Sequence, residues 1–293
     1  MSRTNSAPQR ICVGSYLVSL LLAMLPIAAS AQVTYRQADS ITVCRLLAAA
    51  PPDAGTLHFA RKFIGRPYVA HTLEVNDREQ LVVNTRQLDC TTLVETVAAL
   101  TICARQGRRQ WSDYVETLRT LRYRQGILDG YASRLHYFSD WIADNEALRL
   151  VGELQSPNPP FTALQTVDVS YMSTHPTAYK ALKAQPSLVP VIREQEQALS
   201  GNTCRYIPKS AFRRNTAQLR RVIRDGDILA ITCNKPGLDI AHLGFAVWRK
   251  DGLHLLNASQ LHKKVVTEPM TLYQYLQRHP TFTGIRVVRI NDK

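Results

Sequence analysis

Several features that define common protein classes are missing from this sequence. No Cys-x-x-Cys spacing occurs, which argues against a zinc or dithiol redox site of the usual pattern. There is no internal repeat and no low-complexity tail, and beyond residue 31 no segment is apolar enough to span a bilayer. What remains, with 45% hydrophobic and 20% charged residues, is the composition of an ordinary globular protein.

The first 31 residues have the three parts of a secretory signal peptide. A basic start containing Arg3 and Arg10 precedes an apolar run over residues 13–27, and an Ala-Ser-Ala cleavage site ends at Ala31. The run is short for a membrane span, and a proline interrupts it. We therefore expect cleavage after Ala31, export of residues 32–293, and a periplasmic location in a Gram-negative cell.

Acidic residues are scarce relative to basic ones. The chain has 36 Lys and Arg against 23 Asp and Glu, a net charge of +13, which becomes +11 once the signal peptide is removed. Such an excess favours acidic partners, namely nucleic acid, an anionic membrane surface or an anionic cell-wall polymer, although a basic surface can also serve solubility alone. Export, and the lack of an aromatic–basic RNA-binding pattern, argue against nucleic acid.

Five cysteines remain after cleavage: Cys44, Cys90, Cys103, Cys204 and Cys233. An odd number in an oxidising compartment leaves at least one without a partner in the same chain. If Cys90 stays free, the other four allow three pairings, among which the sequence does not choose. Cys103 lies on the apolar side of the helix that Cys90 begins, so we expect it to be buried.

Helical patterns predominate in the first part of the mature chain. We predict helices around residues 40–50, up to residue 64, from Cys90 onward and through 111–121, with an extended segment at 67–69 and a short strand at 81–84. Residues 126–224 show little regular alternation. We expect them to form a loop-and-helix insertion that packs against the core and is not a separate domain.

The final third of the chain changes to strand patterns. Predicted strands cover residues 226–231, 243–248, 253–258, 263–266 and 285–290. Asp251-Gly252 suits a tight hairpin turn between two of them. Helices followed by a mostly antiparallel sheet indicate an α+β fold in a single domain over residues 32–293.

A cysteine stands where a helix begins. Cys90 follows Asp89, which can cap the helix or bind a substrate amine or N–H group, and apolar residues then recur at helical spacing from Leu93 to Ala104. Unpaired backbone N–H groups and the helix dipole favour a thiolate at such a position, so we expect a lowered thiol pKa.

The base for this thiol is expected on a strand far downstream. His242 begins an apolar strand two residues before Gly244, and the next strand carries Asn257. Cys, His and Asn in this order match papain-like catalysis, in which His takes the thiol proton and Asn orients the imidazole. His254 is the rival partner for His242. It is three residues from Asn257 and so points to the other face of the sheet.

These motifs resemble the NlpC/P60 cysteine peptidases, and more closely the DUF1460 branch of that superfamily. The matching segments cover nearly all of the mature chain and are residues 63–68, 88–95, 133–141, 172–176, 206–209, 226–227, 242–244 and 256–259. The resemblance implies a papain-like core in which the nucleophile helix packs on an antiparallel sheet. It also implies that residues 126–224 form the substrate pocket.

The resemblance further implies N-acetylmuramoyl-L-alanine amidase activity, without metal or cofactor, on muropeptides and above all on small anhydro fragments. Cys90 matches the nucleophile and His242 the base, and Asn257 occupies the third position, where His is common. Tyr68 matches a site tyrosine that can donate to the oxyanion. For substrate binding, the sequence offers Asp89, Ser133, Arg134, His136 and Tyr206, with Arg134 suited to a carboxylate.

Other functions stay open at this point. A γ-D-glutamyl-diaminopimelate endopeptidase would keep the fold and cut a different bond. A non-catalytic muropeptide-binding protein would keep the pocket without turnover, and the Asn at the third position is its only support. Nucleic-acid binding rests on charge alone. The preferred stem length, the need for an anhydro sugar and the oligomeric state are not predicted.

Overall fold

The computed structural model describes residues 33–213 and 216–292 together with Met1, so the predicted signal peptide and its cleavage site lie outside the described residues. The α-helices are α1 (Gln37–Ala48), α2 (Thr56–Ala60), α3 (Cys90–Arg105), α4 (Trp111–Arg122), α5 (Phe138–Ala147), α6 (Tyr171–Thr174), α7 (Lys180–Ala184), α8 (Leu188–Leu199), α9 (Thr216–Val222) and α10 (Leu272–Gln277). None of the helices in these residues combines the length and hydropathy that a bilayer crossing requires.

The strands are β1 (Val33–Thr34), β2 (Leu81–Val82), β3 (Val151–Glu153), β4 (Ala163–Thr166), β5 (Thr203–Pro208), β6 (Ile228–Cys233), β7 (Ile240–Arg249), β8 (Gly252–Ser259), β9 (Lys264–Thr267) and β10 (Phe282–Ile290). Short 3₁₀ turns are η1 (Arg61–Phe63), η2 (Arg124–Gly126), η3 (Tyr131–Ser133), η4 (Pro176–Ala178) and η5 (Lys209–Arg213). The helices and strands predicted outside residues 126–224 are confirmed within a few residues at their ends.

Within the described residues, one eight-stranded antiparallel sheet runs in the order β4-β5-β10-β6-β7-β8-β9, and β3 also pairs with β10. The predicted hairpin joins β7 to β8, where Arg249 pairs with Gly252 and Gly252 has φ +144°. Only glycine adopts that φ readily, which explains the residue at the turn. The α+β class is confirmed.

The segment 126–224 differs from the prediction, because it contributes three strands to the main sheet. Strands β3 and β5 both pair with β10, and β4 pairs with β5. These strands are short, and β4 alternates only between half-buried and exposed residues. Their partner strand lies far along the chain, so no local pattern marked them. Helices α5 to α9 come from the same segment.

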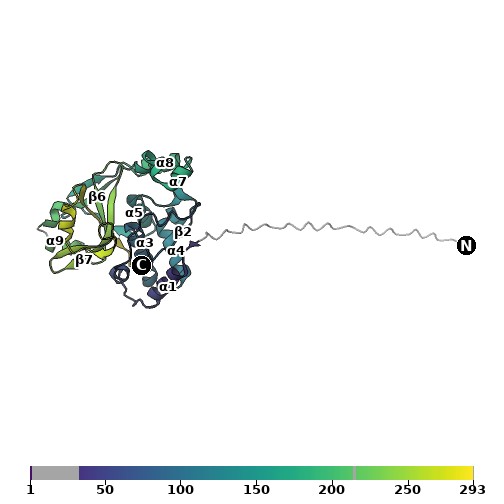
Figure 1. Cartoon of the computed structure of the whole chain (residues 1–293), viewed down its shortest axis with the longest axis horizontal. Helices are drawn as coiled ribbons and strands as arrows, with labels where there is room; N and C mark the ends of the chain where they lie inside the picture. The colour runs from purple at the N-terminus through teal and green to yellow at the C-terminus, as the bar shows by residue number, and fades with distance from the viewer. Residues whose placement is uncertain (2–32, 214–215, 293) are drawn as a thin grey trace. The chain divides into compact units, whose positions relative to one another are not determined.

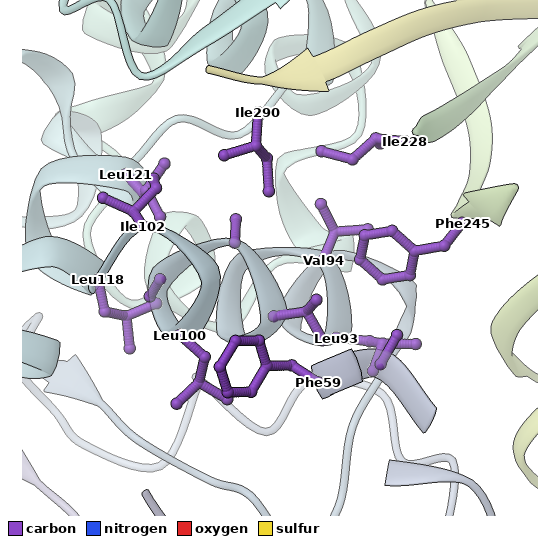
Figure 2. Packing of buried hydrophobic residues seen from close by; sticks show 14 of the residues in the cluster. Phe59, Leu93, Val94, Leu100, Ile102, Leu118, Leu121, Ile228, Phe245 and Ile290 are labelled. Carbon is purple, nitrogen blue, oxygen red and sulfur yellow. The ribbon is translucent and has the colours of Figure 1, made fainter. Parts of the chain in front are cut away.

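Helix α3 lies at the centre of the larger hydrophobic core. Figure 1 shows α3 between the helices α1 and α4, on one side, and the strands β6 and β7, on the other. Every residue from Thr92 to Ala104 is buried, so the helix is enclosed on all faces and not along the single predicted stripe. Figure 2 shows Val94 facing Phe245 of β7 and Ile228 of β6. Helix α3 therefore presents its first residue at the edge of a rigid core.

Candidate active site

Cys90 is the first residue of α3, and the turn before it is held firmly. Asp89 is the N-cap: its Oδ1 accepts a hydrogen bond from the backbone N–H of Thr92 at 2.8 Å. In return, the backbone N–H of Asp89 donates to Thr92 Oγ1 at 2.9 Å. This reciprocal capping box satisfies two backbone donors and fixes where the Cys90 side chain leaves the helix.

The predicted lowering of the Cys90 pKa is wrong. Burial, and then the negative charge of Asp89, raise the pKa of this thiol to about 12, against the opposing effect of hydrogen bonds from Thr91 and from the Leu243 N–H. The cost of burying a thiolate beside a carboxylate thus exceeds the benefit of the helix N-terminus. Cys90 is a neutral thiol at neutral pH and needs a base to become a nucleophile.

His242 and Asn257 are brought together by the β7–β8 hairpin. His242 Nε2 donates to Asn257 Oδ1 at 2.9 Å, and Asn257 is completely buried. His254, the rival partner, instead contacts the backbone oxygen of Glu268 through Nδ1 and Asp251 through Nε2. The structure therefore pairs His242 with Asn257.

His242 is a neutral imidazole in this setting. Burial lowers the pKa of its imidazole, while the hydrogen bond that it donates to Asn257 and the charge of Glu268 work in the opposite direction. With Nε2 committed to Asn257, the other ring nitrogen, Nδ1, makes no hydrogen bond to any described residue. A neutral imidazole with a free Nδ1 can accept a proton from a thiol.

Two adjoining cavities meet at His242, and Cys90 lines the first. The aromatic compartment, about 250 Å³, is lined by Cys90, Thr91, Leu135, His136, Tyr137, Phe138, Trp141, Met172, Tyr179, Asp239 and Leu243. The basic compartment, about 530 Å³, is lined by Lys235, Ser259, Gln260, Leu261, Lys263, Tyr275, His279, Thr281 and Phe282. Both share Leu238, Ile240, Ala241 and His242. The thiol and the imidazole therefore face one cleft.

Two of the predicted substrate-binding residues lie beside Cys90. Tyr68 pairs in a β-bridge with Leu88, two residues before Cys90. Burial raises the pKa of its phenol, and negative charge on Asp89 or on a Cys90 thiolate opposes its ionisation further. The Tyr68 hydroxyl makes no hydrogen bond to the described residues, so it is free to donate. Its backbone N–H donates to the Lys263 oxygen at 2.9 Å, which ties it to the turn before β9.

His136 lines the aromatic compartment as a neutral ring. Burial, together with the nearby charge of Arg134, lowers the pKa of His136 to about 3. Its Nε2 donates to the backbone oxygen of Tyr131 at 2.9 Å, which leaves Nδ1 as an acceptor for a hydroxyl or N–H group. The role of His136 in substrate binding stays a prediction, at a position that lines the cleft.

Arg134 lies outside both compartments, in a buried ion-pair cluster. Its guanidinium pairs with Glu74 and, at 3.6 Å, with Glu79, and its carbon Cζ lies 4.9 Å from the Tyr131 ring centroid. These carboxylates already match its charge. The arrangement holds the loop of residues 74–79 against the 131–134 turn, so Arg134 supports the cleft wall and does not face it.

Ser133 and Tyr206 also lie away from the two compartments. Ser133 Oγ donates to the Gly130 oxygen at 2.7 Å and accepts from the backbone N–H of Asp129, which closes a turn. Tyr206 is on β5, and its ring lies so close to Gly284 that a Cβ there would be 2.7 Å from it. Of the predicted substrate-binding residues, the structure thus places only His136 in the lining of the cleft. Asp89 and Tyr68 lie next to Cys90, and Ser133, Arg134 and Tyr206 lie elsewhere.

Other residues of the cleft were not foreseen from the sequence. Tyr137 and Met172 stand in segments quoted for the family resemblance, so the motifs pointed to their region without giving their role. Lys235, which lines the basic compartment, had no such signal, and neither had Glu268, which lies outside the cleft lining and accepts a hydrogen bond from Asn257. A lone carboxylate at a strand end is indistinguishable from a surface residue until the fold buries it.

The described cysteines form no disulfide. Cys44, Cys90, Cys103, Cys204 and Cys233 are all free thiols in the structure, so none of the three pairings left open is present. Cys103 is completely buried, as predicted, and its Sγ donates to Thr117 Oγ1 at 3.3 Å.

Solved structures similar to this chain come from several bacteria. An N-acetylmuramoyl-L-alanine amidase from Bacteroides uniformis is 40% identical, with a TM-score of 0.75 over 80% of this chain and 97% of that one. A Bacteroides fragilis protein described as a candidate xylanase is 43% identical, with a TM-score of 0.73 over 79% and 99%. The Legionella pneumophila protein LPG0564, of family DUF1460, is 23% identical with a TM-score of 0.67 over 87% and 94%, and shows the fold alone.

No curated protein matches the sequence significantly. The model of one protein family does match, over residues 58–285, and it is described as AmiA-like: N-acetylmuramoyl-L-alanine amidase-like. The matched range includes Cys90, His242 and Asn257 and most of the chain. By its sequence and by its likeness to the Bacteroides structures, the chain belongs to the AmiA-like family.

Proposed function

We propose that this protein is a cysteine-dependent N-acetylmuramoyl-L-alanine amidase. The bond cleaved joins the lactyl group of N-acetylmuramic acid to the stem L-alanine, and the substrates are muropeptides, above all anhydro forms. Membership of an amidase-like family supports this reaction class. The observation that carries the proposal is the His242–Asn257 hydrogen bond at a cleft that Cys90 also lines.

The first step joins proton transfer to nucleophilic attack. Because Cys90 and His242 are both neutral, His242 Nδ1 takes the thiol proton as the sulfur attacks the lactyl carbonyl carbon. The resulting imidazolium keeps its Nε2–H bond to Asn257, which holds the ring in place. Asp89, the residue before Cys90, adds a negative charge that favours the His242 imidazolium.

The negative charge on the carbonyl oxygen needs donors. The backbone N–H of Cys90 is one of the first N–H groups of α3, which have no partner inside the helix. The Tyr68 hydroxyl, close to Cys90, is the second donor. Together they form an oxyanion hole at the helix N-terminus.

Collapse of this intermediate breaks the amide. His242 gives its proton to the leaving nitrogen of L-alanine, and the lactyl group stays on Cys90 as a thioester. A water molecule, deprotonated by the same imidazole, then attacks the thioester carbonyl and restores the thiol. Every proton in both halves passes through His242.

The two compartments suit the two parts of a muropeptide. Aromatic faces such as Tyr137 and Tyr179, with Met172 and the acceptor on His136, suit a sugar ring in the aromatic compartment. Lys235 and Lys263 in the basic compartment suit the carboxylates of the stem peptide. Residues 126–224 build most of the aromatic wall, which supports their assignment as the pocket-forming segment.

Xylan hydrolysis, suggested by the description of the Bacteroides fragilis relative, has less support in this cleft. Glycoside hydrolases need two carboxyl groups that flank the bond. Asp89 is committed to the α3 cap and Asp239 Oδ2 accepts from the Ser139 N–H at 2.7 Å. The Cys–His–Asn set is suited to acyl transfer.

We also propose export to the periplasm, on the basis of the signal-peptide pattern in residues 1–31.

The test is mass spectrometry of a disaccharide-tetrapeptide muropeptide, in anhydro and reducing forms, after incubation with the mature protein. We expect free disaccharide and intact tetrapeptide. Cys90→Ala should lower the rate at least about 1,000-fold, because no other group can form the thioester. Cys44→Ala is the matched control, since Cys44 is a half-buried thiol on α1.

Two other results would point elsewhere. Release of a dipeptide from the stem would assign the γ-D-glutamyl-diaminopimelate endopeptidase activity. Tight binding with no cleavage of either form, unchanged in Cys90→Ala, would make the protein a muropeptide-binding protein.

A further inference from the structure

Glu268, the residue after β9, is a fully buried carboxylate close to the catalytic set. Its exposed fraction is 0%. Its Oε1 accepts a hydrogen bond from Asn257 Nδ2 at 3.0 Å, and its Oε2 lies 3.0 Å from His262 Nε2. Hydrogen bonds therefore connect His242, Asn257, Glu268 and His262 in one line. The hydrolytic steps above make no use of the last two.

Glu268 determines which way the Asn257 amide points. An ionised carboxylate only accepts hydrogen bonds, so it must face the NH₂ end of the amide. The oxygen of Asn257 is then directed at His242, and an oxygen accepts only from an N–H group. His242 must carry its proton on Nε2, which leaves the lone pair on Nδ1.

The charge of Glu268 also acts on His242 directly. The charged and titratable groups that influence the ring are Glu268 and Asp89, which favour the imidazolium, and His279, which opposes it. Tyr275 packs nearby, with ring centroids 6.4 Å apart, and its phenol is neutral because burial raises its pKa. Glu268 is the anion connected to His242 by hydrogen bonds.

We propose that Glu268 is a positioning residue, which acts through Asn257 to fix the Nε2–H tautomer of His242 and to stabilise its imidazolium. The effect of Glu268 on catalysis rests on the proposed function. Its effect on the tautomer and charge of His242 does not. His262, whose side chain is 33% exposed, contacts the second carboxylate oxygen and connects the buried acid to the surface.

The test compares Glu268→Gln with the unchanged mature protein by NMR of ¹⁵N-histidine-labelled samples. Glutamine keeps the size and can accept from Asn257, but it removes the charge. We expect the His242 pKa to fall in the variant. The rising, acidic limb of kcat/KM should move to lower pH, because His242 works as a neutral base, and kcat should fall about tenfold or more.

The control variant is Glu153→Gln, which removes a nearly buried carboxylate paired with Arg286 elsewhere in the sheet. It should leave the His242 pKa and the acidic limb unchanged. Glu268→Asp, which keeps the charge at a shorter reach, should restore part of the activity lost in Glu268→Gln. A purely structural role for Glu268 would lower activity without moving the limb, and that result overturns the proposal.

Two measurements keep the inference testable on its own. The His242 tautomer can be read in the unchanged protein from long-range ¹H–¹⁵N couplings, so it does not depend on whether the variant folds. An Nδ1–H tautomer would refute the proposal. If no muropeptide is cleaved but the Nε2–H tautomer and the pKa change are found, the proposed function fails and the role of Glu268 stands.

Discussion

At the scale of residues, the site is a neutral thiol beside a neutral imidazole. Burial raises the pKa of Cys90 to about 12, and burial lowers the pKa of His242. Both directions disfavour a preformed thiolate–imidazolium pair in the free protein. In the proposed mechanism the proton therefore moves during attack, as it does in serine–histidine catalysis.

This state predicts the pH dependence of Cys90 alkylation. The rate with iodoacetamide should rise continuously from pH 6 to pH 10, because the thiolate population grows with pH until the pH reaches the thiol pKa. The rate is measured at each pH by mass spectrometry of the Cys90 peptide, with the Cys44 peptide as internal reference. A plateau of fast alkylation below pH 7 would instead indicate a preformed ion pair.

At the scale of elements, α3 must be held rigidly for Cys90 to meet His242. Glu95, in the middle of α3, forms a buried ion pair with Arg122 at the end of α4, with 2.7 Å between Oε2 and Nε. Both side chains are 2% exposed. Arg122 also donates to the Val82 oxygen of β2 at 2.7 Å. One guanidinium thus joins two helices and a strand behind the nucleophile.

Removing one member of this pair should be costly. Glu95→Gln leaves the Arg122 charge buried and uncompensated, and we expect the free energy of unfolding to fall by about 3–5 kcal/mol. Urea denaturation monitored by circular dichroism measures the change. The double variant Glu95→Met with Arg122→Met should recover most of the loss. Glu116→Gln, at a 60% exposed partner of Arg108, is the control and should change the free energy by about 1 kcal/mol or less.

An equal loss in the buried and exposed variants would contradict this account of α3. So would a double variant no more stable than Glu95→Gln alone.

At the scale of the whole molecule, the cleft is assembled from distant parts of the chain. The helix start at Cys90, the wall from residues 135–179 and the β7 and β8 strands meet around His242. The full chain has a net charge of +13, and two of its positive side chains, Lys235 and Lys263, line the cleft. This placement favours an acidic ligand on one side of the catalytic set.

The double variant Lys235→Gln with Lys263→Gln tests that placement. We expect KM for a disaccharide-tetrapeptide to rise about two- to tenfold, since two exposed charge contacts are worth up to about 1 kcal/mol each. The kcat should stay near its original value, because neither lysine contacts the reacting atoms. Lys183→Gln with Lys250→Gln removes the same charge away from both compartments and should leave KM unchanged.

The dependence of KM on ionic strength is a second test of the contact between these two lysines and the substrate. Added salt should narrow the difference in KM between the cleft variant and the unchanged protein. Equal effects of the two double variants would mean that overall charge, and not the basic compartment, governs binding.

The elements that local pattern specifies strongly were predictable. Helix α3 and its cap could be recognised from the Asp89–Cys90 start and the apolar residues after it, and strands β6 to β10 from their short runs of strand-forming residues. The order Cys90, His242, Asn257 pointed to one catalytic set, whose His–Asn contact the structure contains. Strands β3 to β5 were missed, because their stability comes from pairing with a distant strand.

The amino-acid sequence by itself determined which side chains were available for acyl transfer and the family to which they belong. Only the tertiary structure decided their electrostatics. Burial reversed the expected direction of the Cys90 pKa, enclosed Arg134 among carboxylates and placed Glu268 behind Asn257. Desolvation and through-space charge depend on what surrounds a group in three dimensions, and spacing along a chain does not encode either.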